Sequence, residues 1–215
     1  MDKYRVDIDL AQVDADSVFQ NQTLGGAGNF VLDGAGVVSG KWISPDSFAH
    51  KISFESAGNL SALTFTITGY SDKSEHNLIT EQVTGPNATT VDSTKYFYSI
   101  TSIASDGAVG TNVQSGFADE AVTDALPLNY WGGVVSVNLD ITGVIDVTIQ
   151  NTFDVVQDIN NLDFTWQDSP STRFVNATSS TNDAYDGIPT ALRLKINSYS
   201  FPTQGSKLTI IQRQY

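Results

Sequence analysis

Apolar and polar residues alternate along much of the chain, which is the pattern of β-strands that bury one face. In residues 63–68, Leu, Phe and Ile alternate with threonines, and a second alternating run follows at residues 78–83. The polar segment between these runs, GYSDKSEHN, has the composition of a hairpin loop. The Gly-Pro-Asn sequence at 85–87 predicts a turn, after which TKYFYSITSI begins another strand-rich run.

The second half of the chain repeats this pattern more regularly. Residues 135–141 carry an apolar residue at every second position, and the alternation resumes over residues 145–149 after a glycine at 143. We interpret these two runs as a hairpin with a tight turn. Residues 192–196 alternate in the same way, and the final run KLTIIQRQY predicts a C-terminal strand.

Helix signals are scarce, since only DEAVTDAL at 119–126 could form one or two helical turns. This segment coincides with a change from a Gly/Ser-rich stretch to the second β-rich block. We therefore expect an all-β fold of two β-sandwich blocks with minimal helix, a domain of residues 1–125 and a domain of residues 126–215. The pattern leaves open whether the blocks are immunoglobulin-like or jelly-roll-like. Residues 1–45 could include an extended arm that orders on contact with a neighbour.

Composition narrows the function classes further. The 215 residues carry a formal net charge of −13 with a pI near 4.2, so phosphates of nucleic acids and anionic membranes would repel the chain. We expect neither as a partner. The chain has no cysteine, which excludes disulfides and thiolate chemistry. The acidic N-terminus lacks the apolar core of a signal peptide, so synthesis in the cytoplasm is expected.

Candidates for catalysis are few. His50 and His76 are the only histidines, and the G-x-S-x-G motif of many serine hydrolases does not occur. With 24 Asp and Glu residues, a glycosidase-like pair of carboxylates remains an alternative, in a cleft that Trp131, Trp166 and Tyr185 could line. Aromatic residues of a β-sandwich more often fill the core or an interface. We expect the protein not to be an enzyme.

Metal and cofactor sites are also not expected. Asp7, Asp9, Asp14 and Asp16 could supply oxygen ligands, but the run lacks the glycine-punctuated, Glu-terminated loop of a calcium-binding EF-hand. We interpret these residues as a solvated acidic face. The glycine pairs at 25–26 and 132–133 are interpreted as turns, because neither is followed by the Lys-Ser/Thr of a phosphate loop.

Two long stretches resemble virion structural proteins of tailed bacteriophages. The first contains a TFTITG strand, an ITEQVTGPN strand and turn, and a KYFYSITSI strand at similar spacing. The second contains VVSVNLDITGVIDVTIQNTFD, a Trp, an NATSST segment, an IPTALRLKI strand and a final LTIIQ strand. Together they span residues 50 to 215, and the likeness is one of strand and turn pattern.

This resemblance implies a non-enzymatic particle protein located in the virion. An outer capsid decoration or cement protein is the preferred expectation, with a neck or tail protein (connector, tube or fibre associated) as the alternative. A carbohydrate- or receptor-binding module, supported by Trp166 and Tyr185, is a second hypothesis. A polysaccharide hydrolase is the third hypothesis. The expected partners are the major capsid protein or neck and tail proteins, together with further copies of the chain.

Assembly contacts favour aromatic residues and arginine. The segment of residues 154–189 is long and irregular, and such segments are usually functional or interfacial. The candidate assembly residues lie in this segment or just before the second β-rich block: Tyr130, Trp131, Trp166, Arg173, Phe174 and Tyr185.

Overall fold

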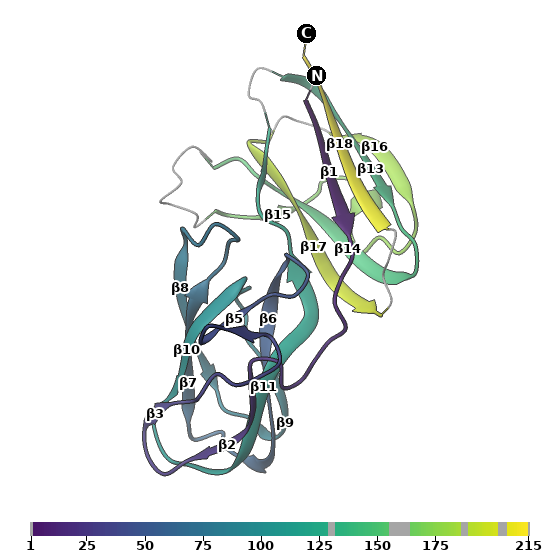
Figure 1. Cartoon of the computed structure of the whole chain (residues 1–215). Coiled ribbons are helices and arrows are strands. Elements are labelled where there is room, and N and C mark those ends of the chain that lie inside the picture. The colour runs from purple at the N-terminus through teal and green to yellow at the C-terminus, as the bar shows by residue number, and fades with distance from the viewer. Residues whose placement is uncertain (1, 129–131, 155–163, 186–188, 202–205, 215) are drawn as a thin grey trace. The chain divides into compact units, whose positions relative to one another are not determined.

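The computed structural model describes residues 2–128, 132–154, 164–185, 189–201 and 206–214 of the chain. Within these ranges the fold is all-β, as the sequence predicts, and the only helical element is the 3₁₀ turn η1 (Thr172–Phe174). The chain divides into two compact units (Figure 1). Unit 1 comprises Met1–Gln12 and Glu120–Tyr215, and unit 2 comprises Val13–Asp119.

Unit 2 contains two antiparallel layers of strands. One sheet has the order β4-β5-β10-β7-β8, with β3 paired to β10, and in the other β11 lies between β2 and β6, with β9 at the edge. The strands are β2 (Phe19–Leu24), β3 (Gly28–Asn29), β4 (Val37–Val38), β5 (Lys41–Ile43), β6 (Ala49–Asn59), β7 (Thr64–Tyr70), β8 (Leu78–Thr84), β9 (Asn87–Asp92), β10 (Ser99–Ser105) and β11 (Val109–Val122), whose last residues belong to unit 1.

The core of unit 2 is rich in phenylalanine. The rings of Phe19 and Phe30 are stacked with centroids 4.5 Å apart, and Phe65 meets Phe30 edge to face at 5.5 Å. Phe54 lies 5.2 Å from Phe65, so strands of both sheets contribute to one aromatic cluster. Each such ring buries a large apolar area, which makes the cluster a main source of the unit's stability. The predicted β7–β8 hairpin is confirmed by continuous antiparallel pairing.

Unit 1 is a second sandwich-like unit. One sheet has the order β1-β18-β13-β16, and in the other β14 lies between β15 and β17, with β12 and the end of β11 also paired to β17. The strands are β1 (Asp2–Ile8), β12 (Leu126–Pro127), β13 (Gly132–Asp140), β14 (Val144–Thr152), β15 (Gln167–Asp168), β16 (Thr181–Tyr185), β17 (Ala191–Ser200) and β18 (Ser206–Gln214).

The predicted hairpin of residues 135–149 is wrong, although both of its strands exist. β13 pairs with β16 and β18, whereas β14 pairs with β15 and β17, so the two strands lie in different sheets. The alternating apolar residues of both strands are buried, whereas Val144 at the start of β14 is exposed. The chain crosses from one sheet to the other between β13 and β14. Gly143 adopts a φ of 90°, a conformation that favours glycine, in this crossing.

The possible helix at residues 119–126 is not present. β11 continues as a strand to Val122, and β12 follows at Leu126. Ala121 and Val122 are buried and pair with Ile196 and Lys195 of β17, so sheet pairing outweighs the weak helix signal of this segment. The chain passes between its two units at residues 119–120, a few residues before the expected boundary at 125.

The N-terminal segment also differs from the expected organisation. β1 pairs with β18 along its whole length, from Asp2 opposite Gln212 to Ile8 opposite Ser206. Ile8 and Leu10 are buried, and the Tyr199 hydroxyl donates a hydrogen bond to the Ala11 carbonyl at 2.7 Å. Residues 1–12 therefore belong to the same unit as the C-terminal half. The remainder of residues 1–45 supplies β2 to β5 of unit 2.

Candidate functional site

The structure describes four of the six predicted contact residues, and these four lie in three different environments. Tyr130 and Trp131 lie outside the described residues. Phe174 and Tyr185 are 0% and 4% exposed, and both belong to the core of unit 1. The Tyr185 hydroxyl donates to Asn151 Oδ1 at 2.7 Å, and burial raises the pKa of this phenol to about 12. Neither buried side chain can meet a partner in this conformation.

Trp166 is half-buried and lies just before β15. The guanidinium carbon of Arg193 lies 4.4 Å from the centroid of the indole, in a cation–π contact, and the ring of Phe164 is perpendicular to it at 6.1 Å. Arg193 Nε donates to Gln150 Oε1 at 2.8 Å, and the Gln150 amide donates to Asp168 at the same distance. This hydrogen-bonded chain crosses three strands and fixes the position of the indole.

Arg173 is an exposed residue of η1, at the edge of the sheet that ends in β16. Its side chain is 65% exposed, and its Nε lies 3.9 Å from the Asp183 carboxylate. Its Nη1 donates to the Asn182 carbonyl at 3.5 Å, and the Ala184 amide is bonded to the carboxylate of Asp183 at 2.9 Å. The side chains of Arg173 and Asp183 thus form hydrogen bonds with main-chain groups of the edge strand β16. Such bonds limit the pairing of this edge with another chain.

Arg173 also borders a groove on the outer face of the sheet β1-β18-β13-β16. Figure 1 shows the strands of this sheet. The groove is shallow and has a volume of about 400 Å³. Successive side chains of a strand point to opposite faces. Val135, Val137 and Leu139 of β13 are buried in the core, so Ser136 and Asn138 point outward.

Strand register brings groups of three residues into rows across this groove. Asn138 lies opposite Asn182 of β16 on one side and Thr209 of β18 on the other. In the next row Ser136 lies between Ala184 and Ile211. The first row consists of two amides and a hydroxyl, which donate and accept hydrogen bonds, and the second row adds two apolar side chains.

The outer face of this sheet has balanced charges. Arg173 lies near Asp183 at the rim of the groove. Elsewhere on the face Lys207 pairs with Asp140 at 3.1 Å. Arg5 pairs with Asp7 at 2.7 Å. This face is therefore less acidic than the net charge of −13 would suggest.

The two histidines have different environments, and the contacts of His50 indicate a structural role. It is fully buried in unit 2, where Nε2 lies 2.9 Å from an Asp46 oxygen and Nδ1 lies 3.2 Å from the Ala118 carbonyl. Each ring nitrogen therefore already has a polar partner. His50 thus has no ring nitrogen left to act as a base toward a nucleophile. His76 is half exposed and lies 3.9 Å from Asp72.

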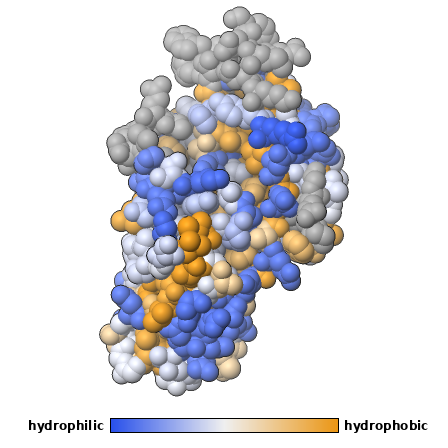
Figure 2. Space-filling model, viewed as in Figure 1, coloured by the Kyte–Doolittle hydropathy of each residue, from blue (hydrophilic) through white to orange (hydrophobic). Residues whose placement is uncertain are grey.

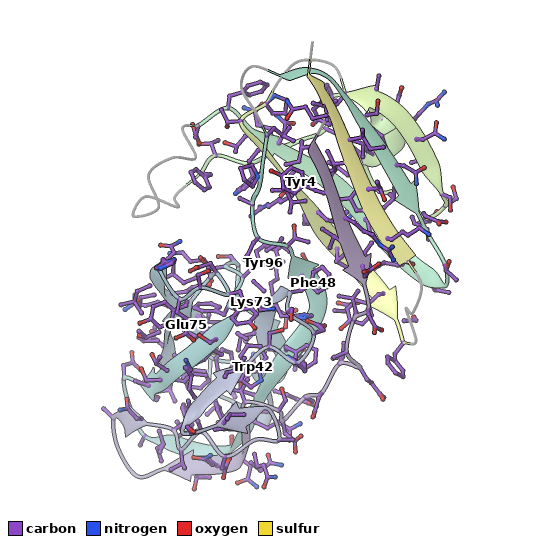
Figure 3. The ribbon with its side chains drawn as sticks, turned by 45° about the horizontal axis from the view of Figure 1, so that its top comes forward. Tyr4, Trp42, Phe48, Lys73, Glu75 and Tyr96 are labelled. Carbon is purple, nitrogen blue, oxygen red and sulfur yellow. The ribbon has the colours of Figure 1, made fainter. Side chains whose placement is uncertain are left out.

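A polar cluster of unit 2 was not predicted from the sequence. Glu75, which Figure 3 labels, lies in the connection between β7 and β8. It forms an ion pair with Lys41 and accepts a hydrogen bond from the Ser99 hydroxyl at 3.0 Å. The bond from Lys41 holds the pKa of Glu75 below its ordinary value. Glu75 has a φ of 55°, which a non-glycine residue adopts rarely. The cluster fixes the connection and offers no reactive arrangement.

The acidic N-terminal residues do not converge on one site. Asp7 binds Arg5, whereas Asp14 and Asp16 lie close together in unit 2. The Asp14 side chain raises the pKa of Asp16. Within the described ranges, no three Asp, Glu, His or Cys side chains form a group that could hold a metal ion.

Hydrophilic and hydrophobic residues are mixed on the face shown in Figure 2, and hydrophobic residues gather in a strip over unit 2.

In the part of the chain that the structure describes, no helix has the length and hydrophobicity needed to cross a bilayer. No model of a known protein family matches the sequence, and no curated protein is significantly similar to it.

Proposed function

We propose that this chain is a non-enzymatic structural component of a tailed-bacteriophage virion, with an outer capsid decoration or cement position as the preferred assignment. It is assembled with the major capsid protein and with further copies of itself. A neck or tail position is the alternative, since both locations lie on the exterior of the particle.

One observation carries the proposal: the stretches that resemble phage structural proteins coincide with paired strands in both units. TFTITG lies in β7, ITEQVT lies in β8, and SITSI begins β10. In unit 1, ALRLKI begins β17 and LTIIQ lies in β18. The resemblance therefore follows the sheets of both units and is not confined to loops.

Charge supports an exterior location. At −13 the chain would be repelled by packaged DNA, and a lumenal wall made of it would add electrostatic cost. On the outside of a particle the same charge favours solubility. The outer surface of the head and the outer surface of the tail both avoid contact with packaged DNA, so the charge does not distinguish between them.

Trp166 is the surface residue that best fits a contact with another virion protein. It is a half-buried aromatic residue whose ring is held by Arg193 and Phe164. A side chain that is already fixed loses little conformational entropy when a partner binds. Aromatic residues held in this way often dominate the energy of protein interfaces.

The proposal is tested by the protein content of purified particles. Virions from cells that produce the chain are purified by density gradient, and their proteins are quantified by mass spectrometry. The proposal predicts that the chain is recovered at a fixed ratio to the major capsid protein, through repeated purification. Recovery that falls with each purification step would contradict it.

A further inference from the structure

We infer that the groove between Arg173 and the outer faces of β13, β16 and β18 is a binding site for a neutral saccharide. The site belongs to the folded unit 1 and does not depend on the proposed function. Where both hold, the virion would carry a surface that binds polysaccharide.

The hydrogen-bonding groups of the groove fit hydroxyl groups. Asn138, Asn182 and Thr209 form one row across three strands, and Ser136 lies in the next. Amide and hydroxyl side chains both donate and accept, as sugar hydroxyls do. Ala184 and Ile211, in the same row as Ser136, provide apolar surface for the C–H groups of a sugar ring. The volume of about 400 Å³ lies in the range of small-molecule sites.

The charges at the groove favour a neutral ligand. Arg173 is the basic residue of its lining and Asp183 is the acidic one, so their charges balance. A phosphate or sulfate group is usually held by several cationic groups, which this groove does not supply. The contacts of Arg173, at 3.9 Å and 3.5 Å, are long, so its guanidinium can turn toward a sugar hydroxyl at little cost.

A peptide strand fits this place less well. Strand addition requires free main-chain groups at the edge of a sheet. At β16 the Ala184 amide already donates a hydrogen bond to the Asp183 carboxylate at 2.9 Å. The groove itself lies on the face of the sheet, where side chains and not main-chain groups meet the ligand.

The groove does not contain Trp166 or Tyr185, the residues that the sequence favoured for binding a saccharide. Tyr185 is buried, and the Trp166 ring is already in contact with Arg193. The groove gives Arg173 a ligand-binding role in place of an assembly contact.

The test is a titration of the whole chain, labelled with ¹⁵N, by neutral trisaccharides of glucose, galactose, mannose and N-acetylglucosamine. At least one should shift the amide resonances of Ser136, Asn138 and Thr209, with a dissociation constant of about 1 mM. Absence of shifts at these residues up to about 10 mM of every trisaccharide would overturn the inference. A uronic acid trisaccharide that binds more than about tenfold tighter than the neutral ones would also overturn it.

Variants then place the site. Ala184→Trp should fill the groove and abolish binding, and Arg173→Ala should weaken it about tenfold through the loss of a charged donor. Lys73→Ala removes one exposed positive charge from unit 2 and should leave binding unchanged. Thermal unfolding checks that each variant folds. Full binding by Ala184→Trp would overturn the inference. Loss of the chain from purified particles would contradict the proposed virion role and leave this titration unaffected.

Discussion

Both ring nitrogens of His50 meet polar groups of unit 2. It is buried in unit 2 between the Asp46 carboxylate and the Ala118 carbonyl, and its ring lies 4.7 Å from that of Phe117. Asp46 also accepts a hydrogen bond from the Phe48 amide at 3.1 Å. Removing one member of such a network leaves a buried polar group without its hydrogen-bond partner, and this cost exceeds that of most other single substitutions.

We therefore expect His50→Gln to lower the free energy of unfolding by about 3 kcal/mol. His76→Gln is the matched control, because His76 is half exposed and its nearest carboxylate lies 3.9 Å away. That control should change stability by less than about 0.5 kcal/mol. Urea denaturation of the two variants measures both values. Equal losses in the two variants would contradict the structural role of His50.

Tyr185 provides a test of burial through pH. Its pKa is raised to about 12 by burial, so the folded state favours the neutral phenol. The stability that this shift contributes is present below pH ~10, the unfolded pKa of tyrosine, and is lost as the pH rises toward about 12. The difference in phenolate absorbance between the wild type and Tyr185→Phe should show one step with a midpoint near pH 12. A step near pH 10 would show that this phenol is exposed.

At the scale of elements, the pairing of β1 with β18 makes the N-terminal segment part of unit 1. It forms the edge of the sheet β1-β18-β13-β16, and Ile8 at its end is fully buried. An arm that ordered only on contact with a neighbour would leave this segment accessible in the isolated chain.

We expect trypsin to cleave slowly after Arg5 in the isolated chain, because the segment is paired with β18. Ile8→Asp should accelerate this cleavage at least about tenfold, since burying an unpaired carboxylate opposes docking of the strand. Asp9→Ala, an exposed position just beyond β1, is the control and should cleave at the wild-type rate. Mass spectrometry of the fragments over time gives the rates. Equally rapid cleavage of all three chains would support a free arm.

The positions of the strands in the sequence were easier to predict than their pairing partners in the sheets. The alternation in β7, β13, β14 and β17 indicates which side chains are buried, because side chains of a strand alternate between faces. It does not indicate the pairing partner. β13 and β14 are adjacent in sequence and look like a hairpin. Apart from the short β15, however, their partners lie between 39 residues (Thr152 and Ala191) and 82 residues (Gly132 and Gln214) away in the chain. Such pairing depends on packing between sheets, which a periodic pattern does not contain.

The candidate site was harder to predict for the same reason. Its groove combines Asn138, Asn182 and Thr209, which become neighbours only through the order of three strands. Each is an ordinary outward-facing polar residue in its own strand. Phe174 and Tyr185 lie near a long irregular segment without periodicity, so the sequence carried no signal that both are buried.

At the scale of the whole molecule, Trp166 should matter for assembly more than Arg173. We expect Trp166→Ala to reduce incorporation into particles at least about fivefold, because truncating a central aromatic contact typically costs more than 1 kcal/mol. Arg173→Ala is the matched surface control on the same unit and should be incorporated normally. Quantitative mass spectrometry of purified particles gives the ratios, and thermal unfolding of the isolated variants checks their fold. Normal incorporation of Trp166→Ala would remove this residue from the interface.

Both units are sandwich-like arrangements of antiparallel strands, and their sheets have open edges. Such a domain must protect its edge strands, and Arg173 and Asp183 do so at β16. In a symmetric particle, identical copies would present the same surfaces at every equivalent position. The proposed outer position in the virion would agree with the acidic charge of the chain.

The most direct measurement of the virion role is antibody labelling of intact particles, viewed by electron microscopy. The antibody is raised against this chain and first shown to detect it in lysates of cells that produce the particles. We predict label distributed over the outer surface of the head, whereas label restricted to the neck or tail would select the alternative position. Particles that carry no label, while the same antibody detects the chain in the lysate, would contradict the account.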